Sequence, residues 1–579
     1  MNASIKRIGK TTGRLCQFDN RIAGTKIERE AADYLRGLLL EIGYDVVEHE
    51  FPIIAWEPLS LTVELVSPEA RALHCALFPG SPSVKHRAVL VSLESEQRET
   101  SNKLPRYGYT EWGESLYTSP ETPYNKAIDQ GLDGLIISSP DEGELLKVRV
   151  GNHGKQLQIP VISASKETGE SLRKIMKSSD VTLDVECKVR RGPSKSYNLE
   201  AILKGRQPDF DVILSAHYDA WFSGAADNAA PVAIVIEVAR QLREYVQQKG
   251  TLKRTVRFLL FGAEEGGTER AISWLNGSRS YIESQKSIDH IGLIVNLDSI
   301  GYKATNFVGS TYELLNFSKS ISTAIKQERR FNHYSPPANG SDHWFFTERG
   351  TPTVYLISWP SPLYHTQKDA PEFLDYDSIQ AYAEYAFHSV MEFSNAEVLP
   401  LDVMDVIGYL NERVSELEKA EGNPFALQEL SDSLTRILEF RKQLEDFSRK
   451  AAKAKNKRDT ARLNDFLISA SRRTNRAIGL VTGVHEARYL ARLELIQEYM
   501  AVNSALLTLE KMPFTKIHPR TLASLREYDD VPNKLVDVVD AIMNLRSECN
   551  RLASLIREEI ATLLSNLRVT QNDLEKLLT

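Results

Sequence analysis

The chain has 579 residues, of which 42% are hydrophobic and 26% are charged, and its formal net charge is −7 at pH 7. This composition is ordinary for a globular protein, and the length predicts about three domains. So small a net charge excludes a strong overall field, and we expect neither nucleic acid nor a membrane surface as a partner. The four cysteines are scattered without a Cys-x-x-Cys pair, which argues against a disulfide framework and against a thiolate zinc site.

The first residues carry no export signal that the sequence pattern can identify. The segment from Met1 to Thr12 lacks an apolar core of the length that a signal peptide needs. No stretch approaches the roughly 18 consecutive apolar residues of a membrane-spanning helix. We therefore expect a cytoplasmic protein.

A helix and a strand are predicted within residues 20–51. Thr25 and Glu28 form a capping-box pattern, an apolar stripe with helical spacing follows, and Gly43 is a natural helix end. Residues 44–51 then alternate in polarity like a strand. We assign residues 1–55 to the first part of an α/β core.

Residues 56–195 differ from the first segment in their sequence pattern. Short strand patterns follow one another and are separated by proline, glycine and serine. One helical pattern, at residues 125–131, interrupts them. This composition predicts a mostly β module inserted into the core. The predicted strands are 61–66, 88–93, 134–138, 147–150, 159–163 and 181–189.

Residues 196–395 alternate between strand and helix patterns and form the second part of the core. Such alternation predicts a mostly parallel sheet with helices on both faces. The predicted strands are 199–203, 212–215, 256–261, 293–297 and 353–357, and the predicted helices are 229–246, 314–327 and 379–393.

Residues 396–579 are almost wholly helical in pattern. Apolar residues from Leu535 to Ile556 step by three and four, and this heptad seam continues after one slip to Leu567. The seam fits equally well the core of a bundle within the chain and an interface with a second copy. The predicted fold class is therefore α/β, with a mostly parallel core sheet, an inserted β-rich module and an all-helical C-terminal domain.

Four strand patterns of the core end in residue types that bind or orient metal ions. The carboxyl ends of parallel strands meet at one edge of a sheet, so side chains far apart in sequence converge there. We therefore expect one site at this edge. Its residues are His217, Asp219, Asp227, Glu264, Glu265, Asp298, Tyr364 and His365.

This mixture of residue types fits a hydrolytic metal site. Imidazoles and carboxylates without thiolate suit zinc or a related ion that stays open to water, and two ions bridged by one carboxylate can activate that water. At a strand end, Glu264 and Glu265 are expected to point opposite ways, so that one binds metal and the other takes a proton. Asp219 is placed to accept the second imidazole N–H of His217.

Several short motifs carry a resemblance to a known family. They are His217-Tyr-Asp-Ala-Trp-Phe-Ser-Gly-Ala-Ala-Asp227-Asn, Gly262-Ala-Glu-Glu265, Asn296-Leu-Asp-Ser299, Ser341-Asp-His-Trp344, Tyr364-His-Thr366 and Asn20-Arg-Ile-Ala-Gly-Thr25. In these motifs the chain resembles the co-catalytic zinc exopeptidases, which include glutamate carboxypeptidase, bacterial leucyl aminopeptidases and the non-catalytic transferrin receptor. The resemblance implies that residues 56–195 are a protease-associated domain and that residues 396–579 are a dimerisation-like domain.

The same resemblance implies a role for each site residue. His217 and Asp298 would hold one zinc ion, Glu265 and His365 the other, and Asp227 would bridge them beside a peptide bond of unusual geometry. Glu264 would be the general base, Asp219 the partner of His217, and Tyr364 a substrate-binding residue. Two zinc ions per chain are the expected cofactors, with cobalt or manganese as possible substitutes.

The expected function is hydrolysis of a peptide bond at a chain end. An aminopeptidase is favoured because no local arginine cluster predicts recognition of a substrate carboxylate. The alternatives are a glutamate carboxypeptidase-like enzyme, a catalytically silent transferrin receptor-like scaffold, and an acyl-transfer cyclase on the same fold. Peptides are the expected substrates, and a homodimer formed through the C-terminal helices is the expected assembly.

Overall fold

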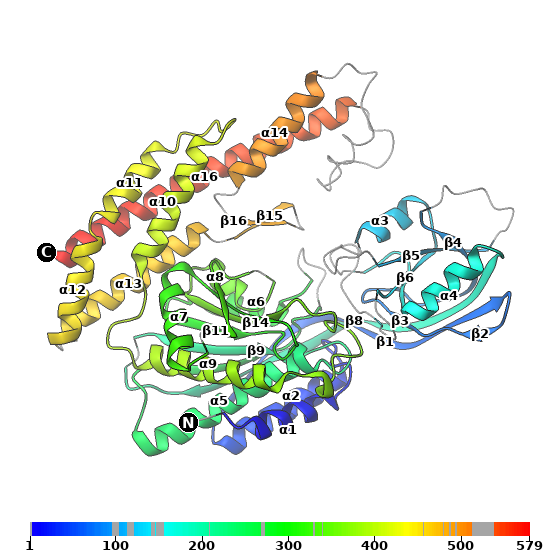
Figure 1. Cartoon of the computed structure of the whole chain (residues 1–579), viewed down its shortest axis with the longest axis horizontal. Helices are drawn as coiled ribbons and strands as arrows, with labels where there is room; N and C mark the ends of the chain where they lie inside the picture. Colours follow the sequence, from blue (N-terminus) through cyan, green and yellow to red (C-terminus); the bar gives the residue numbers. More distant parts are fainter. Residues whose placement is uncertain are drawn as a thin grey trace.

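The structure is a computed structural model that describes most of the chain (Figure 1). The described residues are 3–94, 104–112, 121–140, 145, 156–207, 209–267, 273–327, 330–338, 340–454, 457–478, 480–485, 488–491, 495–511 and 538–579.

The core is built on a mixed sheet whose central strands run parallel. β9 (Asp211–His217) pairs in parallel with β10 (Val256–Phe261) on one side and with β11 (Ile291–Leu297) on the other. β11 in turn pairs in parallel with β14 (Thr353–Trp359). Every residue of β9 and β11 is buried, as expected for parallel strands that are covered on both faces. The predicted α/β fold class with a mostly parallel sheet is confirmed.

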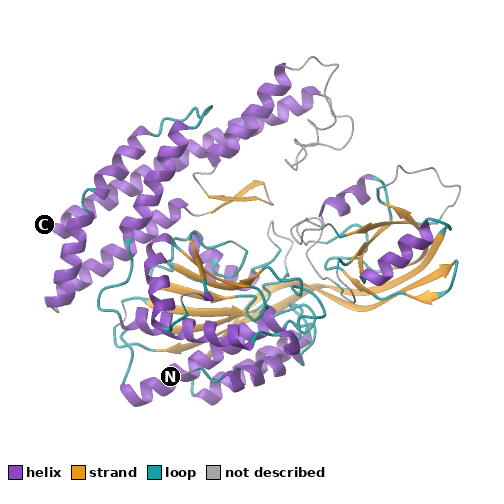
Figure 2. Cartoon of the chain, viewed as in Figure 1, coloured by secondary structure: helices purple, strands orange, loops and turns teal. Residues whose placement is uncertain are grey.

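Helices pack on both faces of this sheet, and Figure 2 shows the resulting layers. One apolar cluster joins Val212 and Leu214 to α1 (Ile5–Cys16), α2 (Lys26–Ile42), α5 (Ala230–Lys249), α7 (Leu315–Ala324) and α9 (Tyr376–Asn395). A second cluster joins Ile213 and Leu259 to α6 (Asn276–Ser284) and α8 (Trp344–Glu348). Successive side chains of a strand point to opposite faces, so neighbouring residues of β9 enter different clusters.

The far edge of the core sheet consists of strands that the sequence pattern did not predict. β12 (Thr305–Ser310) pairs antiparallel with β14, and β13 (Asn332–Tyr334) pairs in parallel with β12. Phe307 of β12 and Tyr334 of β13 contribute to one wall of the cavity described below.

Two long strands link the core to the inserted region (Figure 1). β1 (Val46–Ser67) and β8 (Val181–Leu203) pair antiparallel along nearly their whole length. One end of β8 pairs with β10 in the core, and its other end pairs with β4 (Val84–Ser92). A continuous path of hydrogen-bonded strands therefore runs from the core sheet into the predicted insertion.

The inserted region continues this sheet and adds two helices. Its further strands are β2 (Arg71–Ala72), β3 (Cys75–Leu77), β5 (Arg106–Glu111), β6 (Gly134–Ser138) and β7 (Val161–Ala164). The predicted helix is α3 (Glu121–Asp129), and α4 (Lys166–Met176) is a helix that the pattern did not predict. The strand predicted at 147–150 lies outside the described residues. The domain boundaries and the protease-associated assignment stay predictions.

The C-terminal part is helical. Its helices are α10 (Val403–Lys419), α11 (Gln428–Leu438), α12 (Arg441–Ala454), α13 (Lys457–Ile478), α14 (Leu495–Lys511) and α16 (Val538–Leu578), with a short ribbon of β15 (Leu480–His485) and β16 (Arg488–Ala491). None of the helices in the described ranges has both the length and the apolar character needed to cross a membrane.

The heptad seam of α16 is buried against helices of the same chain. α16 packs on α11, α13 and α14, and the seam residues Leu545, Cys549, Leu552, Ile556, Leu563 and Leu567 are buried there. Of the two predicted uses of the seam, the structure shows the internal bundle over this stretch. Leu535, where the pattern begins, lies outside the described residues. The homodimer stays a prediction, without support from this seam.

Candidate metal centre and active site

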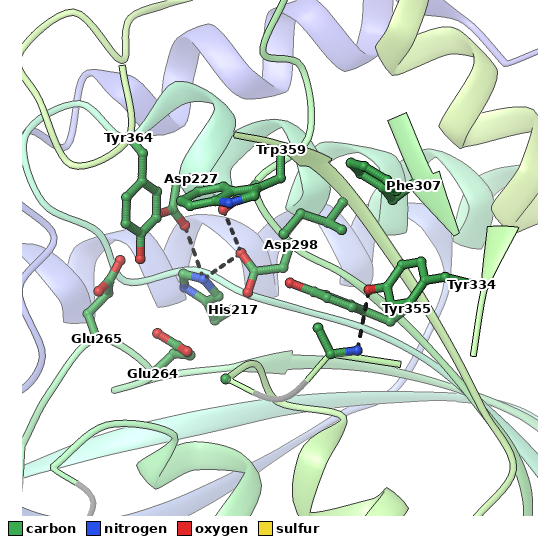
Figure 3. A pocket seen from close by; sticks show the side chains of 14 residues that line it. His217, Asp227, Glu264, Glu265, Asp298, Phe307, Tyr334, Tyr355, Trp359 and Tyr364 are labelled. Carbon is green, nitrogen blue, oxygen red and sulfur yellow. Dashed lines mark hydrogen bonds and ion pairs between the residues drawn. The ribbon is translucent and has the colours of Figure 1, made fainter. Parts of the chain in front are cut away.

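Six acidic and imidazole side chains converge at the carboxyl edge of the parallel strands, and Figure 3 shows five of them, all except His365. β9 ends in His217, the glutamate pair follows β10, Asp298 follows β11, and His365 follows β14. Asp227 comes from the turn between β9 and α5. All six side chains are buried. The structure thus brings together every residue that the sequence predicted as a metal ligand, together with Glu264.

Asp227 lies between the two histidines. Its Oδ1 atom is 3.3 Å from Nε2 of His217, and its Oδ2 atom is 3.2 Å from Nε2 of His365. Asp298 Oδ1 is 3.4 Å from the same nitrogen of His217, and Glu265 Oε1 is 2.9 Å from that of His365. The cluster therefore forms two donor sets, each with one imidazole and one carboxylate of its own, and Asp227 offers one oxygen to each.

This donor set fits a pair of divalent cations. The ligand atoms of His217, Asp227 and Asp298 lie within 4.8 Å of one another, and so do those of Asp227, Glu265 and His365. Buried nitrogen and oxygen donors without thiolate suit zinc or a related borderline ion. A carboxylate with its two oxygens directed to different imidazoles has the arrangement of a bridging ligand. The assignment of individual residues to individual ions stays a prediction.

The acidic residues of the cluster also raise the pKa values of both histidines. Burial alone would lower the pKa of His365, but Glu265 and Asp227 outweigh it and raise that pKa to about 9. Burial would likewise lower the pKa of His217, yet the charge of Glu264 and bonds to three aspartates raise it well above its usual value. Carboxylates that raise the pKa values of two buried imidazoles create a negative potential, which favours bound cations.

Both glutamates of the pair line the same cavity (Figure 3). The prediction that Glu264 and Glu265 point opposite ways is therefore wrong. The pleat ends at Phe261, and Ala263 has a positive φ of 50°, so the chain leaves the strand before it reaches the pair. The indole N–H of Trp221 donates to Glu265 Oε2 at 3.0 Å, which leaves Oε1 beside His365. The sequence pattern does not indicate this contact of Trp221.

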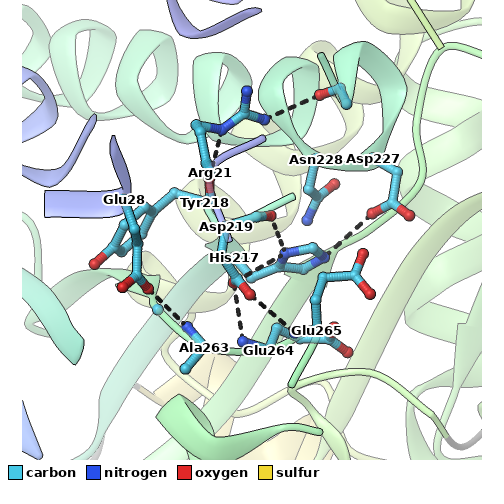
Figure 4. Close-up of polar contacts among 12 residues, drawn as sticks. Arg21, Glu28, His217, Tyr218, Asp219, Asp227, Asn228, Ala263, Glu264 and Glu265 are labelled. Carbon is cyan, nitrogen blue, oxygen red and sulfur yellow. Dashed lines mark hydrogen bonds and ion pairs between the residues drawn. The ribbon is translucent and has the colours of Figure 1, made fainter. Parts of the chain in front are cut away.

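Asp219 lies behind the glutamate pair (Figure 4). Its Oδ1 and Oδ2 atoms accept the backbone N–H groups of Glu264 and Glu265, each at 2.9 Å. Nδ1 of His217 is 3.1 Å from the backbone carbonyl of Asp219 and 3.6 Å from its carboxylate. The predicted partnership with His217 thus runs mainly through the carbonyl of Asp219, while the carboxylate holds the two glutamate amides.

Asn228 ties the Asp227 turn to the segment that carries Asp298. The Asp227–Asn228 peptide is cis, which is the unusual geometry that the resemblance implied. The Asn228 side chain donates to the carbonyl of Leu297 and accepts the N–H of Ser299, both at 3.2 Å. One amide side chain therefore holds the backbone on both sides of Asp298.

Two buried residues near the N-terminus hold the site loops from behind (Figure 4). Arg21 donates to the carbonyls of Tyr218 at 2.8 Å and Ser223 at 2.9 Å, between His217 and Asp227. Glu28 accepts the N–H of Ala263 at 3.1 Å. The sequence signal was present, since both residues lie in or beside the predicted N-terminal motif, but the pattern does not reveal what they contact.

A cavity of about 470 Å³ opens beside the cluster. The acidic residues form one end of it, and a mainly aromatic wall faces them (Figure 3). Tyr364, the predicted substrate-binding residue, lines the cavity, and its ring stacks on His365 with 3.7 Å between ring centroids. The wall consists of Phe307, Tyr334, Tyr355, Ile357 and Trp359, whereas Tyr364 lies beside Glu265 at the acidic end (Figure 3).

The chain is similar to known proteins over this region. Residues 198–390 match the family model for Peptidase family M28. The chain is 24% identical over 365 residues to the glutamate carboxypeptidase 2 homolog of Caenorhabditis elegans, covering 50% of this chain and 46% of that protein. It is 26% identical over 265 residues to transferrin receptor protein 2 of Homo sapiens, covering 39% and 32%. The matches thus span less than half the length of these two curated relatives.

Among solved structures, the fold is similar to that of BSAP, a zinc aminopeptidase from Bacillus subtilis. The TM-score is 0.54 at 22% identity, and the match covers 67% of this chain and 95% of that chain. The chain therefore has the mostly parallel α/β fold of the zinc exopeptidases, and its residues 198–390 are similar to peptidase family M28.

Proposed function

We propose that the chain is a metal-dependent exopeptidase that removes amino-terminal residues from peptides. The observation that carries the proposal is the lining of the cavity, which has carboxylates at one end and an apolar wall at the other. No lysine or arginine occurs among the described residues that line it. Carboxylates attract the free α-ammonium group of a peptide, whereas a terminal carboxylate calls for arginine or lysine.

In this proposal, one metal ion would be held by His217 and Asp298, and a second by Glu265 and His365. Asp227 would bind both ions. When bound, the ions polarise the scissile carbonyl and lower the pKa of a water molecule. Trp221 restrains Glu265 by its hydrogen bond, so that the oxygen next to His365 stays directed to the donor set.

Glu264 is the general base in this proposal. It lines the cavity beside His217, and its backbone is fixed by Asp219. Its carboxylate takes a proton from the attacking water as the oxygen adds to the scissile carbonyl carbon. It then gives that proton to the nitrogen as the carbon–nitrogen bond breaks, so that the leaving amine departs neutral.

The aromatic wall would take the side chain of the first substrate residue. Trp359 packs edge-on against Tyr364 with 4.8 Å between ring centroids, and Tyr364 stacks on His365. This row of rings connects the apolar wall to the donor cluster, so that the side chain and the scissile bond of one substrate can be held together.

The test is Glu264→Gln, assayed on peptides with free and with blocked N-termini, with and without chelator. We expect hydrolysis only of the free peptides by the wild type, loss of that activity in chelator, and a fall of at least a hundredfold in the variant. The metal content of the variant should match that of the wild type. Unchanged turnover would refute Glu264 as the base, and release of residues from the carboxyl end would refute the aminopeptidase.

The names of the two relatives favour two other functions, a carboxypeptidase and a receptor. The absence of a cation from the described cavity lining argues against the carboxypeptidase, and the complete set of buried donors with Glu264 argues against a silent scaffold. An acyl-transfer cyclase would be excluded by peptide hydrolysis with two bound ions. We further propose, from the sequence alone, that residues 56–195 are a protease-associated domain and that the protein is cytoplasmic.

A further inference from the structure

A buried carboxylate outside the donor set contacts the backbone that carries Asp227. Asp369 is 2% exposed and follows His365 in the same loop. Its Oδ1 atom accepts the N–H of Ala226 at 2.7 Å, and its Oδ2 atom accepts the N–H of Asp227 at 3.0 Å. Its backbone carbonyl accepts the N–H of Ala225 at 3.0 Å. One residue therefore holds three successive amides of the Asp227 turn.

These amides need a partner that the turn itself does not provide. The first N–H groups of a helix have no acceptor within the helix, and a local side chain usually caps them. Here the capping position is Gly224, which has no side chain to offer, and Asp227 departs from helical φ and ψ. Asp369 supplies the missing acceptors from a distant part of the sequence.

Asp369 also connects Asp227 to the loop that carries His365. Asp227 contacts His365 through its side chain and Asp369 through its backbone, while His365 and Asp369 belong to one loop. Tyr302, which is buried, donates its hydroxyl to Asp369 Oδ2 at 3.2 Å and so fixes the orientation of the carboxylate. A displacement of Asp369 must therefore move Asp227 relative to the two imidazoles.

We propose that Asp369 is a positioning residue that sets the place of the Asp227 carboxylate between His217 and His365. In a metal-loaded protein it thereby determines how well both ions are held. The claim about metal rests on the proposed donor set, and only its effect on turnover rests on the proposed peptidase activity. Two N–H donors require two acceptor atoms. An asparagine offers one acceptor and turns its own NH₂ group toward the remaining N–H.

The test is Asp369→Asn in the full chain, stripped of metal and titrated with Co²⁺ by visible absorption. We expect two Co²⁺ ions per wild-type chain, and in the variant an affinity lower by roughly 10- to 100-fold, the usual effect of losing a residue that supports a metal ligand. With peptide substrates, kcat should fall more than KM rises. An Asp369→Asn protein that titrates and turns over like the wild type would overturn the proposal.

The matched control is Glu313→Gln, which also replaces a fully buried carboxyl group by an amide. Glu313 contacts Thr311 and Asn475 near the beginning of β14, the opposite end of that strand from His365. It should change thermal stability without changing the Co²⁺ titration. Equal losses of Co²⁺ affinity in both variants would mean that Asp369 acts only through general stability, which also overturns the proposal.

A second variant keeps the test decisive if Asp369→Asn does not fold. Tyr302→Phe removes one bond to Asp369 and leaves the three amides in place, so we expect a smaller loss of Co²⁺ affinity in the same direction. An unchanged titration in Tyr302→Phe would then count against the proposal. Two bound Co²⁺ ions without peptide hydrolysis in the wild type would refute the peptidase but not the positioning role, and no Co²⁺ binding would refute both.

Discussion

Asp219 is hydrogen-bonded to Glu264 through the backbone, with its Oδ1 atom 2.9 Å from the amide nitrogen. Its second oxygen makes the same contact with Glu265 at 2.9 Å. The loop after β9 thus fixes the loop after β10, so that the proposed base and a proposed metal ligand are held by one carboxylate. This contact explains why both glutamates can face the cavity after the strand has ended.

The first prediction concerns this carboxylate. Asp219→Ala leaves two buried amides without an acceptor, which costs about 1–3 kcal/mol for each. We expect a lower thermal midpoint and a fall in kcat of roughly 10- to 100-fold. Asp219→Asn keeps one acceptor and should lie between the wild type and the alanine variant in both measurements. An alanine variant with wild-type kcat would contradict the assigned role.

The second prediction concerns metal stoichiometry. Each imidazole contacts a separate donor set, whereas Asp227 contacts both. His217→Ala and His365→Ala should each retain about one ion per chain, and Asp227→Ala should lose most of both. Elemental analysis after dialysis against metal-free buffer measures this. Two ions retained in either histidine variant would show that the donor sets are not divided as proposed.

The sequence was sufficient where one local signal determined the structure. The buried apolar runs 134–138 and 256–261 were predicted with the bounds of β6 and β10. The metal-binding residues after the core strands could also be predicted, because the ability to bind a metal ion follows directly from the residue type. Parallel pairing then required that they meet at one edge.

The sequence was insufficient where long-range packing decided the result. α1 contains two glycines and two threonines, which are poor helix formers, and its buried side packs on α5. The supporting contacts of Asp369, Glu28 and Arg21 are made largely to backbone groups far away in sequence. Backbone donors and acceptors occur at nearly every position, so no residue pattern reveals which of them a buried side chain will contact.

The third prediction concerns substrate choice. The wall facing the acidic residues includes Phe307, Tyr334 and Ile357 and should favour a large apolar first side chain. We expect kcat/KM to be at least about tenfold higher for peptides that begin with Leu or Phe than for those that begin with Asp or Glu. Phe307→Ala should reduce the rate on Phe-peptides more than on Ala-peptides. A preference for acidic first residues would contradict this use of the wall.

The last prediction concerns pH and stability, and it involves Glu313 at the far end of β14. Burial raises the pKa of this carboxyl to about 7, against its usual 4.5, even though Asn475 and Thr311 donate hydrogen bonds to it. Between these pH values the unfolded chain has lost the proton that the folded chain keeps, so stability falls as the pH rises. The shift corresponds to about 3 kcal/mol in full. Glu313→Gln has no proton to lose, so its stability should change less with pH, and above pH 7 its stability should exceed that of the wild type.

Urea unfolding of the metal-free proteins at pH 5, 6, 7 and 8 measures this difference. The control is Glu416→Gln, which changes a largely exposed carboxylate and should keep the wild-type dependence of stability on pH. Parallel pH profiles for the wild type and Glu313→Gln would mean that Glu313 is ionised in the fold.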